Sequence, residues 1–106
     1  MAFQNFGGDA TQETWARTML SDGEQLVAIV DTDNRFISVT NSRLILNEKD
    51  GSYSIIRIQQ ISAIEVSAGE GDEKFVKIYF GGGLSRMLSA PNEVQAAAIA
   101  SGGAGV

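Results

Sequence analysis

The chain contains no cysteine and no histidine, one proline, and no long apolar run. Without cysteine and histidine it has no disulfide, no thiol nucleophile, no Cys/His zinc site and no imidazole for acid–base catalysis. Its longest apolar runs are about five residues, as in 26–30, far shorter than a membrane-spanning helix requires. Residues 1–8 contain no lysine or arginine and no apolar segment, so no signal peptide is expected.

Positive charge is also scarce. Eight Lys and Arg residues stand against thirteen Asp and Glu, which gives a formal charge of −5 and a pI near 4.5. A general electrostatic attraction to nucleic acid or to anionic lipid is therefore not expected. The length of 106 residues and a hydrophobic content of 43% fit one globular domain. With no cysteines to indicate a redox compartment, the cytoplasm is the default location.

Motifs that could carry catalysis or bind a metal are incomplete. Residues 31–34 (Asp-Thr-Asp-Asn) lack the glycine and the glutamate of a calcium-binding loop, and a polar hairpin turn explains them. The glycines at 81–83 are not followed by the Lys-Ser/Thr of a phosphate-binding loop. The carboxylates within 70–73 lie in a glycine-rich loop that gives a catalytic pair no fixed geometry. We expect no enzyme activity, no cofactor and no metal site.

The pattern of apolar residues predicts a helix, seven strands and a second helix. The first helix begins at Asp9 or Thr11 and ends at 21–23. The second covers 92–100, with Pro91 in its first turn and Ser89 or Ala90 as its N-cap. Between them lie seven short β-rich runs separated by turns. These runs are 24–30, 35–40, 43–46, 53–58, 61–66, 74–80 and 84–89.

Alternation along the strands predicts which side chains form the core. In 24–30, Leu26, Ala28 and Val30 share one face. In 74–80, Val76 and Ile78 face inward, while Phe75 and Tyr79 face the other way. The expected core comprises Leu26, Ala28, Val30, Val39, Leu44, Leu46, Ile56, Ile64, Val76 and Ile78. The glycine-rich residues 102–106 are expected to end the second helix as a loose tail, and 1–8 to form a flexible lead.

Three short motifs follow one another along the chain, each separated from the next by about fifteen residues. They are Gly23-Glu24, the Thr-x-x-Arg-Leu of 40–44, and the Ile-x-x-Ile-x-x-Ile of 58–64. With these motifs the chain resembles the bacterial PH-like (pleckstrin-homology-like) domains over 23–101. Each motif alone is degenerate, and the ordered set carries the resemblance. A bulge near Gln59-Gln60 would bring the three isoleucines of the last motif to one core.

The resemblance implies a mainly β fold. It is a PH-like seven-stranded antiparallel barrel or orthogonal sandwich with a C-terminal helix and a short N-terminal helix. The implied organisation is a lead and helix over 1–22, the PH-like domain over 23–101 and a flexible tail over 102–106. The final helix of this chain is short, alanine-rich and without a large aromatic residue, so one barrel end should be lightly closed.

Lipid-headgroup binding is the activity most associated with the PH superfold, and it depends on basic residues around the first hairpin. Here that hairpin carries Asp31 and Asp33 against Arg35 alone, so an anionic phosphate would meet like charge. Basic residues elsewhere form a candidate weak anion patch, for which scattered solubilising charge is the alternative. The candidates are Arg35, Arg43, Lys74 and Lys77.

Large apolar side chains outside the expected core point instead to protein–protein contact. The candidate interface residues are Phe3, Phe6, Trp15, Met19, Phe75 and Tyr79. We therefore expect a non-catalytic interaction or scaffold module that forms a homo-oligomer or binds a protein partner; a peripheral membrane or lipid-headgroup module is the alternative. In a rival arrangement the N-terminal helix folds back onto its own barrel and the protein is a monomer. The number of subunits cannot be read from the sequence, and head-to-tail contacts could close a ring.

Overall fold

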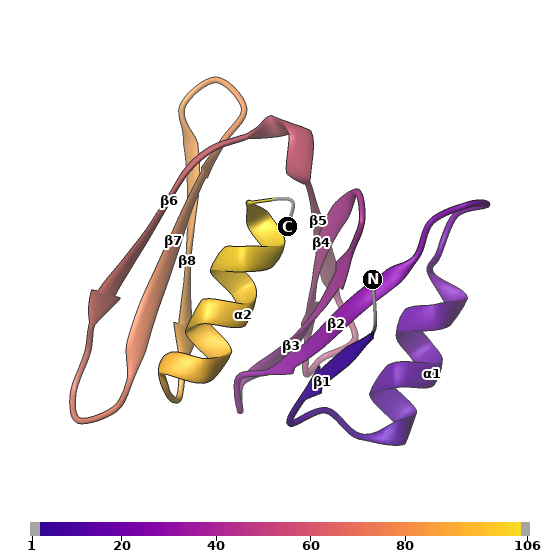
Figure 1. Cartoon of the computed structure of the whole chain (residues 1–106), viewed down its shortest axis with the longest axis horizontal. Helices are drawn as coiled ribbons and strands as arrows, with labels where there is room; N and C mark the ends of the chain where they lie inside the picture. The colour runs from indigo at the N-terminus through magenta and orange to yellow at the C-terminus, as the bar shows by residue number, and fades with distance from the viewer. Residues whose placement is uncertain (1–2, 105–106) are drawn as a thin grey trace.

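A computed structural model of the chain describes residues 3–104, which form two β-sheets and two helices (Figure 1). The first sheet has five strands in sequence order, and the second has three. The first contains β1 (Gln4–Phe6), β2 (Leu26–Asp31), β3 (Arg35–Thr40), β4 (Arg43–Glu48) and β5 (Tyr53–Arg57). The second contains β6 (Ile61–Ala68), β7 (Lys74–Phe80) and β8 (Leu84–Ala90).

The mainly β fold expected from the sequence is confirmed. All seven expected strands are present, and wherever two of them are neighbours in a sheet they are antiparallel. The two sheets do not close into a barrel, and the C-terminal helix α2 (Glu93–Gly103) lies between them as in a sandwich (Figure 1). A single 3₁₀ turn, η1 (Ile58–Gln60), turns the chain from one sheet to the other at the expected position.

The N-terminal segment contains a strand where a flexible lead was expected. Strand β1 pairs in parallel with β2, with Phe6 opposite Val30. The polar and glycine-rich sequence of this segment does not reveal the pairing, because three strand residues are too few to show a period. Met1 and Ala2, the first residues of that expected lead, lie outside the described part of the chain.

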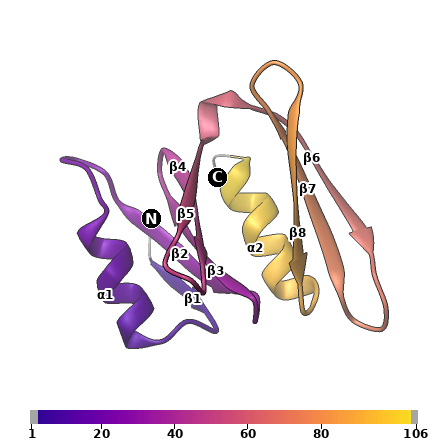
Figure 2. The same ribbon diagram turned by 180° about the vertical axis from the view of Figure 1, so that it is seen from behind.

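The N-terminal helix α1 (Ala10–Thr18) covers the outer face of the first sheet (Figure 2). Asp9 begins it with a capping box: its carboxylate accepts a hydrogen bond from the Gln12 amide at 2.8 Å, and the Gln12 side chain accepts one from the Asp9 amide at 2.9 Å. On this helix, Ala16 is fully buried and packs with Leu26 and Ile29 of β2. The first sheet is therefore covered on both faces.

The main core lies between the two sheets and α2. Nine of the ten expected core residues are buried, and Ile64 is half-buried at its edge. The expectation that Leu26 shares a face with Ala28 is wrong. A register shift between these two residues places Leu26 opposite Thr40 and turns its side chain toward α1.

The C-terminal helix differs from expectation at both ends. Asn92, rather than Ser89 or Ala90, is its N-cap and accepts a hydrogen bond from the Gln95 amide at 3.1 Å. The expectation that Gly102 and Gly103 end the helix is wrong, because both are helical and buried. Ala104 is the C-cap of the helix, and the rest of the expected tail, 105–106, lies outside the described residues. Neither helix in the described part of the chain is long and apolar enough to span a membrane.

Candidate functional site

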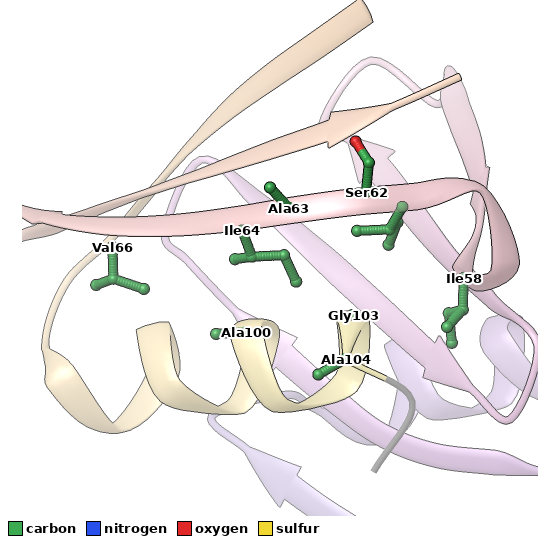
Figure 3. A pocket seen from close by; sticks show the side chains of 9 residues that line it. Ile58, Ser62, Ala63, Ile64, Val66, Ala100, Gly103 and Ala104 are labelled. Carbon is green, nitrogen blue, oxygen red and sulfur yellow. The ribbon is translucent and has the colours of Figure 1, made fainter. Parts of the chain in front are cut away.

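An apolar groove runs between β6 and the C-terminal half of α2, with a volume of about 490 Å³. Figure 3 shows Ile64 and Val66 pointing from β6 toward α2, where Ala100 faces them. The groove is lined by Ile58, Ile61, Ser62, Ala63, Ile64, Val66, Ala100, Gly103 and Ala104. Val66 remains 45% exposed, which is unusual for a valine on the core-facing side of a sheet.

The local sequence explains why this groove is open. The turn η1 and a register shift between Ile61 and Ala63 bend the start of β6, so that Ile58, Ile61 and Ile64 all reach the same side. Opposite them, α2 presents only small residues, and no large side chain fills the space. The sequence predicted that the small residues of the final helix would leave one end of the fold lightly closed, and this groove lies beside those small residues.

Strand β6 is also an edge strand, since within residues 3–104 it pairs only with β7. The Gly69 amide donates to the Glu73 carbonyl at 2.9 Å, just beyond the end of the β6–β7 ladder. Hydrogen-bonded pairs alternate along an antiparallel ladder, so Glu65 and Ser67 bond toward β7. The backbone groups of Ile64, Val66 and Ala68 consequently point away from β7, along the free edge.

The chemistry available in the groove is limited to apolar contact and backbone hydrogen bonding. None of its nine lining residues is ionisable. The only side-chain hydroxyl is that of Ser62, which donates to the Tyr79 carbonyl at 3.3 Å. An apolar floor beside unpaired backbone groups is suited to an added strand, as in β-augmentation.

The six predicted interface residues do not form one surface. Phe3 and Trp15 pack on the outer face of the first sheet, where the Trp15 ring meets Phe36 at 5.8 Å and Tyr53 at 5.7 Å between ring centroids. This packing corresponds to the rival arrangement, in which the helix folds back onto its own sheet. Phe6 packs against the main core instead.

The other three predicted interface residues lie in two further places. Met19 is the half-buried C-cap of α1. Phe75 and Tyr79 are half-buried on the outer face of the second sheet, because they alternate with the buried Val76 and Ile78 as expected. On that face the Tyr79 hydroxyl donates a hydrogen bond to Glu65.

The four predicted anion-patch residues are also dispersed. Arg35 and Arg43 lie at opposite ends of the β3–β4 hairpin, and each is ion-paired: Arg35 with Glu48 at 3.2 Å and Arg43 with Glu24 at 2.6 Å. Lys74 and Lys77 point to opposite faces of β7. The described structure therefore places these charges apart.

Sequence reasoning missed several exposed apolar side chains. Alternation along 61–66 places Val66 on the same face as Ile64, but alternation does not predict whether anything covers that face. No sequence signal marks β6 as an edge, since strand order follows from the whole topology. Other exposed apolar residues are Tyr53, Ile55, Leu84, Met87 and Val94.

Two of the three sequence motifs meet in a part-buried ion pair. The Glu24 carboxylate accepts hydrogen bonds from Arg43 Nε at 2.8 Å and Nη2 at 2.6 Å, and from the hydroxyls of Thr40 at 2.6 Å and Ser42 at 2.8 Å. The Arg43 guanidinium holds the pKa of Glu24 far below its ordinary value, against the effect of burial, and the carboxylate raises the pKa of Arg43. The pair joins the start of β2 to the β3–β4 turn.

No protein-family model matches the sequence, and no curated protein matches it. The structure is similar to a pleckstrin homology domain from Shewanella amazonensis SB2B, with a TM-score of 0.65 and 25% identity over 84% of this chain and 82% of that one. It is also similar to a DUF1696 family protein with a pleckstrin-homology domain from Shewanella loihica PV-4, with a TM-score of 0.63 and 24% identity over 79% and 84% of the two chains. The PH-like fold implied by the sequence motifs is thus confirmed.

Proposed function

We propose that this PH-like domain is a non-catalytic interaction module that self-associates through the free edge of β6. The observation that carries the proposal is the coincidence of two features on one strand. The unpaired backbone groups of Ile64, Val66 and Ala68 line the edge, and the apolar groove opens directly beside them. A second copy of the same strand can satisfy both features at once.

A two-fold antiparallel pairing centred on Val66 fits the side chains of β6. It places Ile64 opposite Ala68 of the second copy, so that all outward backbone groups meet a partner. The only charged residue of the strand, Glu65, then faces Ser67 of the second copy, and no like charges oppose each other. The uncharged grooves of the two copies lie on the same side of the resulting six-stranded sheet.

Size-exclusion chromatography with light scattering tests this proposal directly. The wild-type chain is expected to elute at twice its monomer mass of 11.3 kDa at high concentration. Val66→Lys should give monomers, because a lysine at the centre of the edge would meet its own copy across the two-fold axis. Leu84→Lys is the matched control: Leu84 is also an exposed apolar residue of the second sheet but lies outside the groove, so this variant should remain dimeric.

Two results would contradict the proposal. One is a wild-type monomer at high protein concentration, and the other is an association that Val66→Lys leaves unchanged. Lipid-headgroup binding, the alternative function, predicts salt-sensitive sedimentation with anionic vesicles. Asp31 and Asp33 at the first hairpin, with Arg35 engaged by Glu48, do not favour it.

A further inference from the structure

We propose that a second pocket, between the β3–β4 turn and the end of β5, binds the phosphate group of a small ligand. This pocket has a volume of about 480 Å³, within the range typical of small-molecule sites. It lies on the other side of η1 from the apolar groove, and the two share only Ile58. The inference does not depend on self-association of the chain.

The charges at this pocket are not balanced by the protein. Arg43 and Arg57 are direct cross-strand partners on β4 and β5, where like charges normally destabilise a sheet. Glu24 neutralises Arg43 through two hydrogen bonds, and the Thr40 and Ser42 hydroxyls also donate to this carboxylate. Arg57, by contrast, is exposed and makes no ion pair or side-chain hydrogen bond within residues 3–104. Within these residues, the positive charge of Arg57 therefore has no counter-charge beside the pocket.

The remaining polar groups around the pocket can donate hydrogen bonds. Asn41 Oδ1 accepts from the Gln25 amide at 3.0 Å, which leaves its Nδ2 group available to a ligand. The Gln59 amide and the Ser21 hydroxyl also line the pocket. No acidic side chain lines it; the nearest in sequence are the saturated Glu24 and the exposed Asp22.

A cationic guanidinium with several neutral donors and no acidic lining residue is suited to an oxyanion. Guanidinium groups bind phosphate through paired, charge-assisted hydrogen bonds. The pocket is larger than a phosphate ion needs, so a phosphorylated small molecule or a lipid phosphate could each supply the group. Its location, away from the acidic first hairpin, spares the ligand the repulsion of Asp31 and Asp33.

Titration with inorganic phosphate, at ionic strength held constant with chloride and followed by ¹H–¹⁵N NMR, tests the site. Saturable shifts are expected at the backbone amides of Asn41, Ser42 and Gln59. Arg57→Gln should weaken binding at least tenfold while leaving the folded spectrum intact, because Arg57 is exposed. The control Arg17→Gln, which removes an exposed arginine paired with Glu13 on α1, should bind phosphate as the wild type does.

Vesicles of phosphatidylcholine with phosphatidic acid distinguish the two sources of the phosphate group. Binding of free phosphate that is lost in Arg57→Gln supports a site for soluble ligands. Sedimentation with the vesicles alone, lost in Arg57→Gln and kept in Arg17→Gln, assigns the same site to a lipid phosphate. The proposal is overturned if neither probe binds, or if Arg17→Gln weakens binding as much as Arg57→Gln does.

Discussion

At the scale of single residues, the ion pair between Glu24 and Arg43 explains why two short motifs far apart in sequence accompany this fold. The Glu24 side chain is only 4% exposed. It accepts four hydrogen bonds from β3, β4 and the turn between them, and a fifth from the Ser21 amide. Arg43 Nη2 also donates to the Met19 carbonyl at 2.7 Å, at the end of α1. One guanidinium thus fixes the helix, the start of β2 and the hairpin relative to each other.

Glu24→Gln should destabilise the fold by about 2–3 kcal/mol, somewhat below the cost of breaking a fully buried pair because Arg43 keeps some exposure. The variant preserves the shape of the side chain and leaves Arg43 without its counter-charge. Urea unfolding measures the difference. Glu13→Gln is the matched control: it breaks an exposed pair within α1, and should cost only about 0.3–0.5 kcal/mol.

The same carboxylate predicts how stability depends on pH. In the unfolded chain Glu24 takes up its proton near its ordinary pKa of 4.5, whereas in the folded chain Arg43 lowers that pKa far below this value. Its contribution is therefore complete above about pH 4.5 and is lost progressively as the pH falls further, because the unfolded state then binds more protons. Urea midpoints between pH 6 and pH 2 should fall more steeply for the wild type than for Glu24→Gln.

Asp50 does not affect that comparison. Its pKa is also lowered, chiefly by a hydrogen bond from the Ser52 hydroxyl, so it contributes in the same direction. Both proteins retain Asp50, and its contribution cancels in the difference between them. Parallel pH profiles for the wild type and Glu24→Gln would show that Glu24 does not supply the acid sensitivity.

At the scale of elements, α2 depends on two glycines for its close approach to both sheets. A Cβ on Gly102 would lie 2.5 Å from Val39 Cγ1, and one on Gly103 would lie 2.6 Å from Ile64 Cδ1. Val39 is buried and stiff at χ1, whereas the end of the half-buried Ile64 side chain can move. The helix can therefore continue through residues that elsewhere would end it.

Gly102→Ala should lower stability by about 1–3 kcal/mol, the usual cost of overpacking a core. In an open helix the same change would instead add about 0.5–1 kcal/mol. Ser101→Ala, at the neighbouring exposed position, is the control and should be neutral or slightly stabilising. Thermal unfolding measures both variants, and a more stable Gly102→Ala would show that α2 does not approach β3 so closely.

Trp15 packs helix α1 onto the first sheet through two aromatic contacts. Trp15→Ala should cost about 2–3 kcal/mol, less than for a fully buried tryptophan, because it removes edge-to-face contacts with Phe36 and Tyr53. Light scattering should show the same mass as for the wild type, since Trp15 packs within its own chain. If Trp15→Ala abolished association without lowering stability, Trp15 would instead be an interface residue, as the sequence predicted.

At the scale of the whole molecule, two open sheets leave four edge strands where a closed barrel would leave none. Among these, β6 combines an eight-residue edge with an apolar groove. The two sheets are also linked at their far side, where Arg86 of β8 donates hydrogen bonds to Glu48 and Ser54 of the first sheet. Side-chain hydrogen bonds thus join the two sheets near β8, whereas β6, on the opposite side, is an edge strand.

Hydrogen exchange should report the state of that edge. The amides of Ile64, Val66 and Ala68 are expected to exchange slowly at high protein concentration and fast in Val66→Lys, because a second copy protects them only when bound. The amides of Glu65 and Ser67, which bond to β7, are internal controls and should stay slow in both. Fast exchange of the edge amides at every concentration would exclude pairing through β6.

Much of this fold was determined by local sequence. Alternation in 74–80 predicted both the bounds of β7 and its inward face, since side chains in a strand alternate regardless of context. Of the two predicted caps for α1, Asp9 and Thr11, the structure has Asp9, and such a cap can be predicted because a capping carboxylate acts within one turn. The ordered motifs predicted the PH-like arrangement, and two of them proved to meet in the Glu24–Arg43 pair.

Tertiary structure decided the features that depend on what lies opposite a residue. The bulge at Leu26 depends on pairing with Thr40, and the helical state of Gly102 depends on Val39 beneath it. Likewise, Arg43 is paired with Glu24 in the folded chain and Arg57 is not, because only Arg43 reaches the Glu24 carboxylate. The candidate sites themselves arise from strand order and from the gap beside α2. Sequence specifies local geometry through short-range sterics and hydrogen bonds, whereas exposure and charge balance depend on residues that only the folded chain brings together.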